Sequence, residues 1–174
     1  YAGAILAAAV DATTLEIWTD VSGMMTADPR LVTNVKHIPQ IAYQEAMELS
    51  HFGAKVIYPP TLQPVMSKGI PVWIKNTFAP ADKGTVIESL TRGKGDIVRG
   101  ISSINNIALI SLEGSGMIGI PGFSKRLFEA LSSEKINVIL ITQSSSEHSI
   151  CVGIDSSSVE KAKQAVDAAF ANEI

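Results

Sequence analysis

The sequence predicts an α/β protein whose first part is a mostly parallel sheet and whose second part is a separate α+β unit. Strand-like and helix-like segments alternate up to residue 75, which is typical of a mostly parallel sheet. Turn-forming residues then interrupt this alternation, namely Pro80, Gly84 and the run Arg92-Gly93-Lys94-Gly95. From residue 107 the predicted order is strand, helix, strand, strand, helix. We therefore expect one domain over residues 1–78, a linker and the start of a second region over 79–96, and a second domain over 97–174.

Composition limits the class of protein. The chain has 174 residues, of which 46% are hydrophobic and 18% charged, so it can fill a core and is not a disordered chain. With 14 basic and 17 acidic residues the net charge is −3, which gives no reason to expect nucleic acid or a membrane as a partner. No apolar run approaches the ~20 residues that span a bilayer. The single cysteine, Cys151, excludes an intrachain disulfide framework and a cysteine-based zinc site, which favours a cytoplasmic protein.

The chain starts at Tyr1, without Met, inside an Ala-rich stretch that predicts a helix over residues 2–12. No basic residues precede this stretch and Asp11 interrupts it, so it does not have the pattern of a signal peptide. We expect the sequence to be a piece of a longer protein.

The remaining elements of the first part are short. Apolar residues at helical spacing predict one helix, and Gly53 stands where a left-handed residue would end it. Short β-branched and aromatic runs predict the strands. The expected elements are a strand over 15–18, a helix over 42–52, a strand over 56–57, a helix over 61–67 and a strand over 70–74.

The second part has clearer periodicity, because two of its segments are amphipathic at helical spacing. We expect strands over 97–101, 107–112, 138–142 and 149–154, a helix over 121–135, and a final helix that Ser157 or Ser158 caps and that runs through Phe170. From residue 107 this order gives a ferredoxin-like α+β topology, with room for a closing strand outside the chain.

The densest group of chemically useful residues follows the first predicted strand. Thr19 and Asp20 stand at its carboxyl end, where open α/β sheets bind ligands, and a hydroxyl and a carboxylate suit a ribose or a base. Arg30 suits a phosphate. Ordinary polar residues after a strand and a capped turn at Asp28-Pro29-Arg30 explain the same pattern without a ligand, so these residues alone leave both readings open.

Three further places have more than one interpretation. Lys55 follows Gly53 at a helix-to-strand junction, where a lysine either neutralises a transferring phosphoryl group or is simply solvated. Gly114-Ser115-Gly116 lacks the spacing of a phosphate loop and suits a turn whose amides hold a small carboxylate. Asn137 and Gln143 flank a predicted strand, where an amide either satisfies backbone groups or contacts an amino acid.

The remaining reactive residue types predict no site. His37, His51 and His148 are scattered and lack metal-ligand spacing, so we expect no metal site. Cys151 lies in a predicted strand, where a buried, inert thiol is expected. The serines at 144–146 are predicted to form a turn, since no histidine and carboxylate can be assigned to activate them.

The ordered motifs of the chain resemble those of aspartate kinases. Val138 to Ser149 resembles the first ACT regulatory unit of these enzymes. Segments similar to the C-terminal half of their catalytic domain, part of an amino-acid-kinase sheet, are Trp18-Thr19-Asp20-Val21, Thr26-Ala27-Asp28-Pro29-Arg30, Phe52-Gly53-Ala54-Lys55-Val56 and Lys75-Asn76-Thr77. The resemblance covers essentially the whole chain and is greatest to the threonine-sensitive aspartokinase–homoserine dehydrogenase type.

The resemblance implies that the parent protein phosphorylates L-aspartate to 4-phospho-L-aspartate with ATP and Mg²⁺. Phosphoryl transfer needs positioning and cations more than covalent chemistry, which suits these residue types. Lys55 would be the catalytic, phosphate-neutralising cation, and Met25 stands where the family often has tyrosine, so its contact is apolar here. The implied nucleotide-binding residues are Thr19, Asp20, Met25, Arg30, Lys55 and Val56.

Two family segments are missing from this chain, a Lys-Phe-Gly-Gly loop and a Gly-Gly-Ser-Asp stretch, which carry the catalytic lysine of that loop and the aspartate-binding groups. We therefore expect the chain on its own to be inactive as a kinase and to hold no tightly bound cofactor. The alternative is a non-catalytic, amino-acid-sensing and dimerising ACT module that carries a kinase remnant.

The resemblance also implies feedback regulation by an end-product amino acid and a homo-oligomer through side-by-side ACT units, since exposed sheet edges at 107–112 and 138–142 invite pairing. Loop amides and a helix N-terminus favour the effector's carboxylate. Gln143 both donates and accepts hydrogen bonds, which suits the hydroxyl of threonine better than the ammonium of lysine. The expected effector-binding residues are Gly116, Met117, Phe123, Asn137, Val138 and Gln143.

Overall fold

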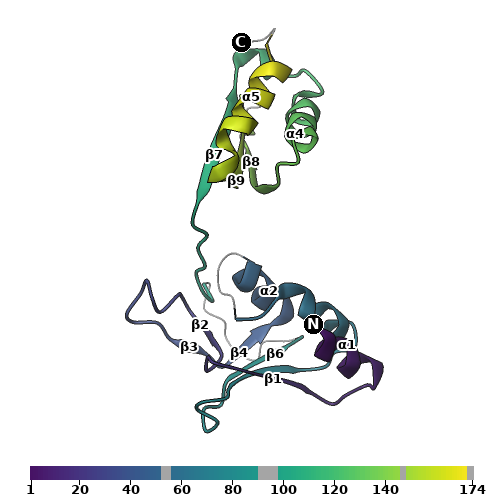
Figure 1. Ribbon diagram of the computed structural model, residues 1–174, viewed down its shortest axis with the longest axis vertical. Coiled ribbons are helices and arrows are strands. Elements are labelled where there is room, and N and C mark those ends of the chain that lie inside the picture. Colours follow the sequence, from purple (N-terminus) through teal and green to yellow (C-terminus); the bar gives the residue numbers. More distant parts are fainter. Residues whose placement is uncertain (52–55, 90–97, 146–147, 172–174) are drawn as a thin grey trace. The chain divides into compact units, whose positions relative to one another are not determined.

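The computed structural model describes residues 1–51, 56–89, 98–145 and 148–171, and it divides into two compact units (Figure 1). Unit 1 comprises Tyr1–Ile104 and unit 2 comprises Asn105–Ile174. Each unit has its own sheet and its own cluster of buried apolar side chains. Separate cores are what distinguishes domains from parts of one domain, so the units are described in turn.

Unit 1 contains a four-stranded sheet and a separate two-stranded pair, β2 with β3. Strands β1 and β5 are parallel, β4 and β6 are parallel, and β5 and β6 are antiparallel, in the order β1-β5-β6-β4. Its elements are α1 (Ala2–Ala9), β1 (Leu15–Thr19), β2 (Met24–Met25), β3 (His37–Ile38), β4 (Gln40–Ala42), α2 (Tyr43–His51), the 3-10 turn η1 (Pro59–Thr61), α3 (Leu62–Met66), β5 (Val72–Asn76) and β6 (Thr85–Glu88).

The helices of unit 1 cover one face of this sheet. Val72, Ile74 and Ile87 are fully buried and pack in one cluster with apolar residues of α1, α2 and α3. Successive strand residues point to opposite faces, so the residues between them, including Trp73 and Val86, face the other side. These two side chains line an open hollow there. The core of unit 1 therefore lies on the helical side.

Two predicted strands of unit 1 are wrong. Val56 and Ile57 lie in a turn, and their side chains pack on the core, so their apolar, β-branched character reflects burial rather than a strand. Residues 98–101 have no regular secondary structure. Ile97 of that predicted strand and Gly53 at the predicted helix end lie outside the described residues.

Two of the three strand pairings of the sheet are parallel, in agreement with the expected mostly parallel sheet, and β6 runs antiparallel to β5. This strand falls within residues 79–96, which the sequence predicts to be a linker, and unit 1 extends to Ile104. Four residues between turn-forming segments are too short a run for periodicity to reveal. Helix α1 ends earlier than predicted, because Asp11 takes a positive φ of 50° and the Ala12 N–H bonds back to the Ala7 carbonyl at 2.9 Å.

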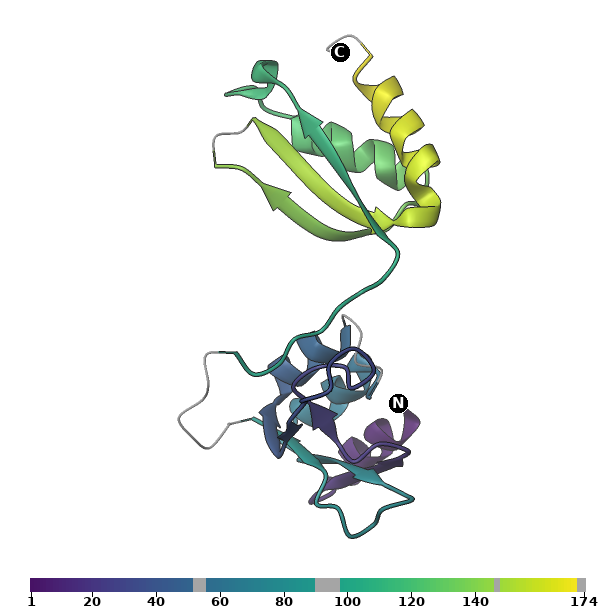
Figure 2. The same ribbon diagram turned by 90° about the vertical axis from the view of Figure 1, so that its left-hand side faces the viewer.

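Unit 2 is a three-stranded antiparallel sheet in the order β7-β9-β8, with both helices on one face (Figure 2). Leu127, Leu131, Val152 and Ile154 are fully buried between the helices and the sheet. Its elements are β7 (Ile107–Glu113), the 3-10 turn η2 (Ser115–Met117), α4 (Phe123–Ser133), β8 (Val138–Gln143), β9 (Ser149–Asp155), the 3-10 turn η3 (Ser156–Ser158) and α5 (Val159–Ala169).

The order and pairing of unit 2 confirm the ferredoxin-like topology expected from the sequence. The middle strand is β9, which leaves β7 and β8 as the edge strands. Ser158 is the N-cap residue of α5, as predicted, but its side chain makes no capping hydrogen bond. The side chain of Asp155 accepts hydrogen bonds from the Ser157 backbone N–H and hydroxyl, at 2.9 and 2.6 Å, and so caps η3 instead.

Candidate functional site

A pocket of about 670 Å³ lies at the carboxyl end of β1. We call it the β1 pocket. Its wall begins with Thr19 and Asp20, continues through the loop that contains β2, and includes Val56 and Asn76. The carboxyl ends of strands are where open α/β sheets bind ligands, because loops rather than side-chain packing cover them.

One buried hydroxyl holds the β2–β3 pair beside this pocket. Thr85, the first residue of β6, is fully buried. Its Oγ1 accepts a hydrogen bond from the Met24 N–H at 2.7 Å and donates to the Ile38 carbonyl at 2.6 Å. Gly23 allows this close approach, since a Cβ there would stand 2.4 Å from the Thr85 hydroxyl and its φ is +102°. The loop wall is thus fixed to the sheet.

A second polar chain links the loop after β1 to the loop after β5. Asn76 Nδ2 donates to Ser22 Oγ at 2.9 Å, and Ser22 Oγ donates to Asp82 Oδ2 at 2.5 Å. The Asn76 side-chain oxygen accepts from the Phe78 N–H at 2.9 Å. Both Ser22 and Asn76 line the pocket, so these bonds shape its wall.

The charged residues of the pocket form a pair. Arg30 Nη2 lies 2.7 Å from Asp28 Oδ2, and the Arg30 N–H bonds to Asp28 Oδ1 at 2.9 Å. The hydrogen bonds from Arg30 hold the pKa of the Asp28 carboxyl below its ordinary value. The same contact raises the pKa of the Arg30 guanidinium, whose side chain stays 83% exposed. A cation oriented by its own carboxylate and open to solvent can receive an anion.

The structure brings together five of the six residues that the sequence suggested for a nucleotide: Thr19, Asp20, Met25, Arg30 and Val56 all line the β1 pocket. The sixth, Lys55, lies outside the described residues. Sequence reasoning assigned no such place to Ser22, Gly23, Asn76 or residues 101–103, which also line it. Asn76 stands in a quoted motif, yet only its contacts with Ser22 and Phe78 reveal its structural role.

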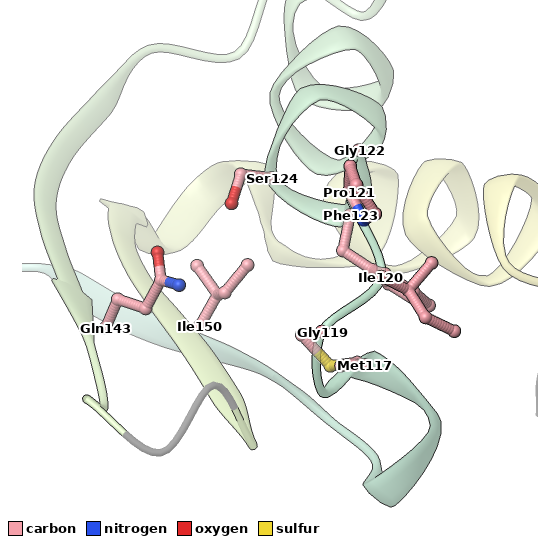
Figure 3. A pocket seen from close by; sticks show the side chains of 9 residues that line it. All are labelled: Met117, Gly119, Ile120, Pro121, Gly122, Phe123, Ser124, Gln143 and Ile150. Carbon is pink, nitrogen blue, oxygen red and sulfur yellow. The ribbon is translucent and has the colours of Figure 1, made fainter.

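Unit 2 contains a second pocket, of about 290 Å³, between the start of α4 and the ends of β8 and β9. We call it the α4 pocket. Figure 3 shows Gln143 and Ile150 on one side and Met117 and Phe123 on the other, with the Ser124 side chain directed toward Gln143. Gly122 precedes α4 and takes a φ of +108°, in the left-handed region. Because glycine has no side chain, the N-terminus of α4 has no side-chain cap.

The α4 pocket contains half of the residues expected to bind an effector. Met117, Phe123 and Gln143 line it, whereas Gly116, Asn137 and Val138 do not. Asn137 precedes β8 and Gln143 ends it, so at ~3.3 Å per residue they are separated by about 20 Å. Within one copy of the chain, both amides therefore cannot contact the same small molecule.

Other candidate sites are not supported by the part of the chain that the structure describes. It contains no group of three or more His, Cys, Asp or Glu side chains that could hold a metal ion. Its helices are too short or too polar to cross a membrane. Cys151 is a free thiol of intermediate burial in β9, so the expected full burial is not observed.

Comparisons with known proteins agree with the two-unit division. Residues 1–76 match the amino acid kinase family, and residues 110–170 match the ACT domain. The bifunctional aspartokinase/homoserine dehydrogenase of Haemophilus influenzae is 46% identical over 174 residues, which are all of this chain. The chain is homologous to aspartokinases. It spans 21% of the length of that relative, and 19% of a carrot chloroplast relative that is 41% identical.

Solved aspartokinase structures show the same relationship. The chain resembles E. coli aspartokinase III in complex with aspartate and ADP (R-state), with a TM-score of 0.70, 36% identity and coverage of 89% of this chain and 34% of that one. For the same enzyme with lysine and aspartate (T-state), the TM-score is 0.69 at 36% identity, over 88% and 34% of the chains. The amino acid kinase segment therefore provides most of the β1 pocket, and the ACT domain contains the α4 pocket.

Proposed function

We propose that unit 1 is the nucleotide-binding side of an aspartokinase active site, at which ATP phosphorylates L-aspartate to 4-phospho-L-aspartate. The observation that carries this proposal is the β1 pocket, because one cavity collects the hydroxyl, carboxylate and guanidinium that a nucleotide requires. The aspartokinase III structure that contains ADP supports the same ligand class. A cytoplasmic location is part of the proposal, on the basis of a single cysteine in the sequence.

The pocket residues suit separate parts of the nucleotide. Thr19 Oγ1 donates to Asp20 Oδ1 at 3.1 Å, which orients the carboxylate toward hydroxyl donors such as those of a ribose. Met25 offers an apolar surface for a base. Arg30, exposed and oriented by Asp28, takes the phosphates.

Mg²⁺ fits this pocket as a companion of ATP rather than as a resident ion. The described residues hold no cluster of three acidic or histidine ligands, and Mg²⁺ usually binds through one or two carboxylates together with substrate phosphates. The described part of the wall has two carboxylates, Asp20, which we assign to the ribose, and Asp28, which is paired with Arg30, so the ion would be held chiefly by the phosphates of the nucleotide. When bound, the ion neutralises phosphate charge, while the chain's own residues orient the nucleotide.

Titration of the chain with Mg·ATP by calorimetry tests nucleotide binding directly. We expect the unsubstituted chain, called the parent chain below, to bind Mg·ATP and the Asp20→Asn variant to bind it more weakly. Asp167→Asn, on the exposed face of α5, is the matched control. Equal affinity for both variants would contradict the site.

Lys55 is proposed as the catalytic cation on the basis of the family resemblance alone. In the full-length protein, Lys55→Ala should lower turnover by about 10² to 10³, the usual cost of removing a preorganised charge at the transition state. Lys68→Ala, an exposed lysine of unit 1 paired with Asp11, is the matched control. Turnover of Lys55→Ala within a few-fold of the parent would refute the role.

We propose further that the ACT domain binds an end-product amino acid, L-threonine, in the α4 pocket. The backbone N–H groups of the first turn of α4 suit its carboxylate, and Gln143 suits its hydroxyl. The aspartokinase III structure with lysine supports a free amino acid as the ligand class. Asn137 and Val138 would take part only from a second copy of the chain, joined through the edge strands β7 or β8.

Gln143→Ala should weaken L-threonine binding by about 1–3 kcal/mol, because the ligand's hydroxyl would lose its partner on leaving water. Gln164→Ala, exposed on α5, is the control. Calorimetry with L-threonine and L-lysine measures both affinities, and tighter binding of lysine would contradict the choice of effector. Light scattering that shows only monomer at about tens of micromolar would contradict the homo-oligomer.

A further inference from the structure

The segment of unit 1 just before the unit boundary also lines the β1 pocket. Ile101, Ser102 and Ser103 are part of its wall, although they lie more than sixty residues beyond most of the others in the sequence. The segment has no regular secondary structure, and unit 2 begins at Asn105. We call residues 99–103 the tether.

Three contacts hold the tether on unit 1. The Ile101 N–H donates to the Thr26 carbonyl at 2.8 Å. Arg99 Nε lies 3.5 Å from Glu45 Oε1 on α2, and both side chains are about two-thirds buried. Between these two residues, the backbone of Gly100 packs against Leu49 of α2.

Gly100 is the position where the fit is tightest. A Cβ there would lie 3.1 and 3.2 Å from the two methyl carbons of Leu49 and 3.3 Å from the Thr26 carbonyl oxygen. Distances this short require the neighbours to move, and one of the neighbours is backbone. The tether is therefore seated between α2 and the loop that carries Met25, and a larger side chain at this position would force the tether, the Leu49 side chain or the loop to move.

The loop that receives the tether is itself fixed. The Thr26 N–H donates to the Lys36 carbonyl at 2.9 Å, and the Lys36 N–H donates to Thr26 Oγ1 at 3.0 Å. The bond from Ile101 thus reaches a rigid part of the pocket rather than a loose loop. Ser102 and Ser103 bring two hydroxyl groups, which suit a ribose hydroxyl or a phosphate oxygen.

We propose that the tether is a nucleotide-binding wall of the β1 pocket and that its seating on unit 1 contributes to nucleotide affinity. This inference rests on the proposed function. A nucleotide that contacts the hydroxyls of Ser102 and Ser103 binds the seated tether better, so it shifts the chain toward that state.

Two tether variants and one control test the proposal. Gly100→Val crowds the contact of the tether with Leu49 and the Thr26 carbonyl, and Arg99→Gln removes only its ion pair with Glu45. Lys68→Met removes a comparable ion pair with Asp11 that does not border the pocket. Mg·ATP affinity and, in a separate titration, L-threonine affinity are measured by calorimetry for each protein.

We expect Gly100→Val to weaken Mg·ATP about ten-fold and Arg99→Gln to weaken it about two- to five-fold, the worth of one ion pair. In both variants affinity for L-threonine should stay as in the parent, because the substituted residues lie in unit 1. Lys68→Met should match the parent in every titration. Because Gly100→Val is the harsher change, the result for Arg99→Gln and a measurement on the unmodified chain support it: Mg·ATP should slow hydrogen exchange at the Ile101 amide.

The outcomes distinguish a failure of this proposal from a failure of the proposed function on which it rests. If the parent binds Mg·ATP but Arg99→Gln binds it as tightly as Lys68→Met does, and the Ile101 amide exchanges at an unchanged rate, the tether is not a wall of the site. If the parent does not bind Mg·ATP, the proposed function is refuted first and the tether proposal with it.

Discussion

The two units differ in the length of their strand pairings. In unit 2, β7 pairs with β9 over seven residues, and β8 pairs with β9 over most of its length. Beside the β1 pocket of unit 1, strands β2 and β3 pair over only two residues each. Two amphipathic helices cover one face of the sheet of unit 2. The short strands of unit 1 depend on single polar contacts between distant residues, such as those of Thr85 with Met24 and Ile38. The same chain thus builds one site on apolar packing and the other on buried hydrogen bonds.

This difference makes the two units separable by mutation, and their aromatic residues make them separable by spectroscopy. Both tryptophans, Trp18 and Trp73, lie in unit 1. Tryptophan fluorescence therefore follows unfolding of unit 1, while hydrogen exchange in β9 follows unit 2.

The largest expected effect is the loss of packing in unit 2. Leu127 of α4 is fully buried, so Leu127→Ala should cost about 2–5 kcal/mol of unfolding free energy through lost burial and the cavity left behind. Exchange of the β9 amides should accelerate, and the fluorescence transition of unit 1 should not move. Lys125→Ala, exposed on the same helix, is the control. An equal shift in the fluorescence transition would mean that the units do not unfold separately.

A smaller effect is expected from the polar contact that supports the β1 pocket. Thr85→Val keeps the side-chain volume but leaves the Met24 N–H and the Ile38 carbonyl without this partner, at a cost of about 1–3 kcal/mol. The fluorescence transition of unit 1 should fall, and exchange in β9 should stay unchanged. Thr85→Ser keeps the hydroxyl and should lie between the parent and the valine variant. If Thr85→Val were as stable as the parent, the buried hydroxyl would not stabilise unit 1.

The smallest effect depends on pH. Tyr43 is buried, its hydroxyl donates to the Ile70 carbonyl at 2.6 Å, and burial, followed by the charge of Glu88, raises its pKa above the ordinary value of 10.0. The folded state therefore keeps a proton that the unfolded state loses, so stability is full below about pH 10 and falls as the pH rises further.

Tyr43→Phe should cost about 0.5–1.5 kcal/mol at neutral pH and should flatten this alkaline decline. Tryptophan fluorescence in denaturant at several pH values measures both quantities. Tyr58→Phe, exposed before η1, should leave neutral-pH stability nearly unchanged. A decline as steep in Tyr43→Phe as in the parent would show that another group controls it.

The same contrast explains how much of the molecule the sequence predicts. Helices α4 and α5 and strands β7, β8 and β9 follow local hydrophobic periodicity, so the sequence predicts each of them within a few residues. Strands β2, β3, β4 and β6 are two to four residues long and exist through partners far along the chain, which no local pattern reveals. Val56 and Ile57 have strand-like composition but lie in a turn, because burial rather than backbone geometry selects them.

The sites follow the same division. Thr19, Asp20 and Arg30 could be recognised because they follow a predicted strand and belong to ordered motifs. Residues 101–103 could not, because contacts with residues far away in the sequence, such as the hydrogen bond from Ile101 to Thr26, bring that segment to the pocket. In the α4 pocket the sequence suggested Asn137 together with Gln143, although the strand predicted between them already separates the two amides, and only Gln143 lines the pocket.

The most direct measurement is a pair of single-ligand titrations, with Mg·ATP and with L-threonine, on the parent chain and on Thr85→Val. If unit 1 holds the nucleotide and unit 2 the amino acid, the parent binds both ligands. The variant then binds Mg·ATP about ten-fold more weakly and L-threonine with unchanged affinity. If Thr85→Val weakened both affinities equally, or weakened only the affinity for L-threonine, the account would be contradicted.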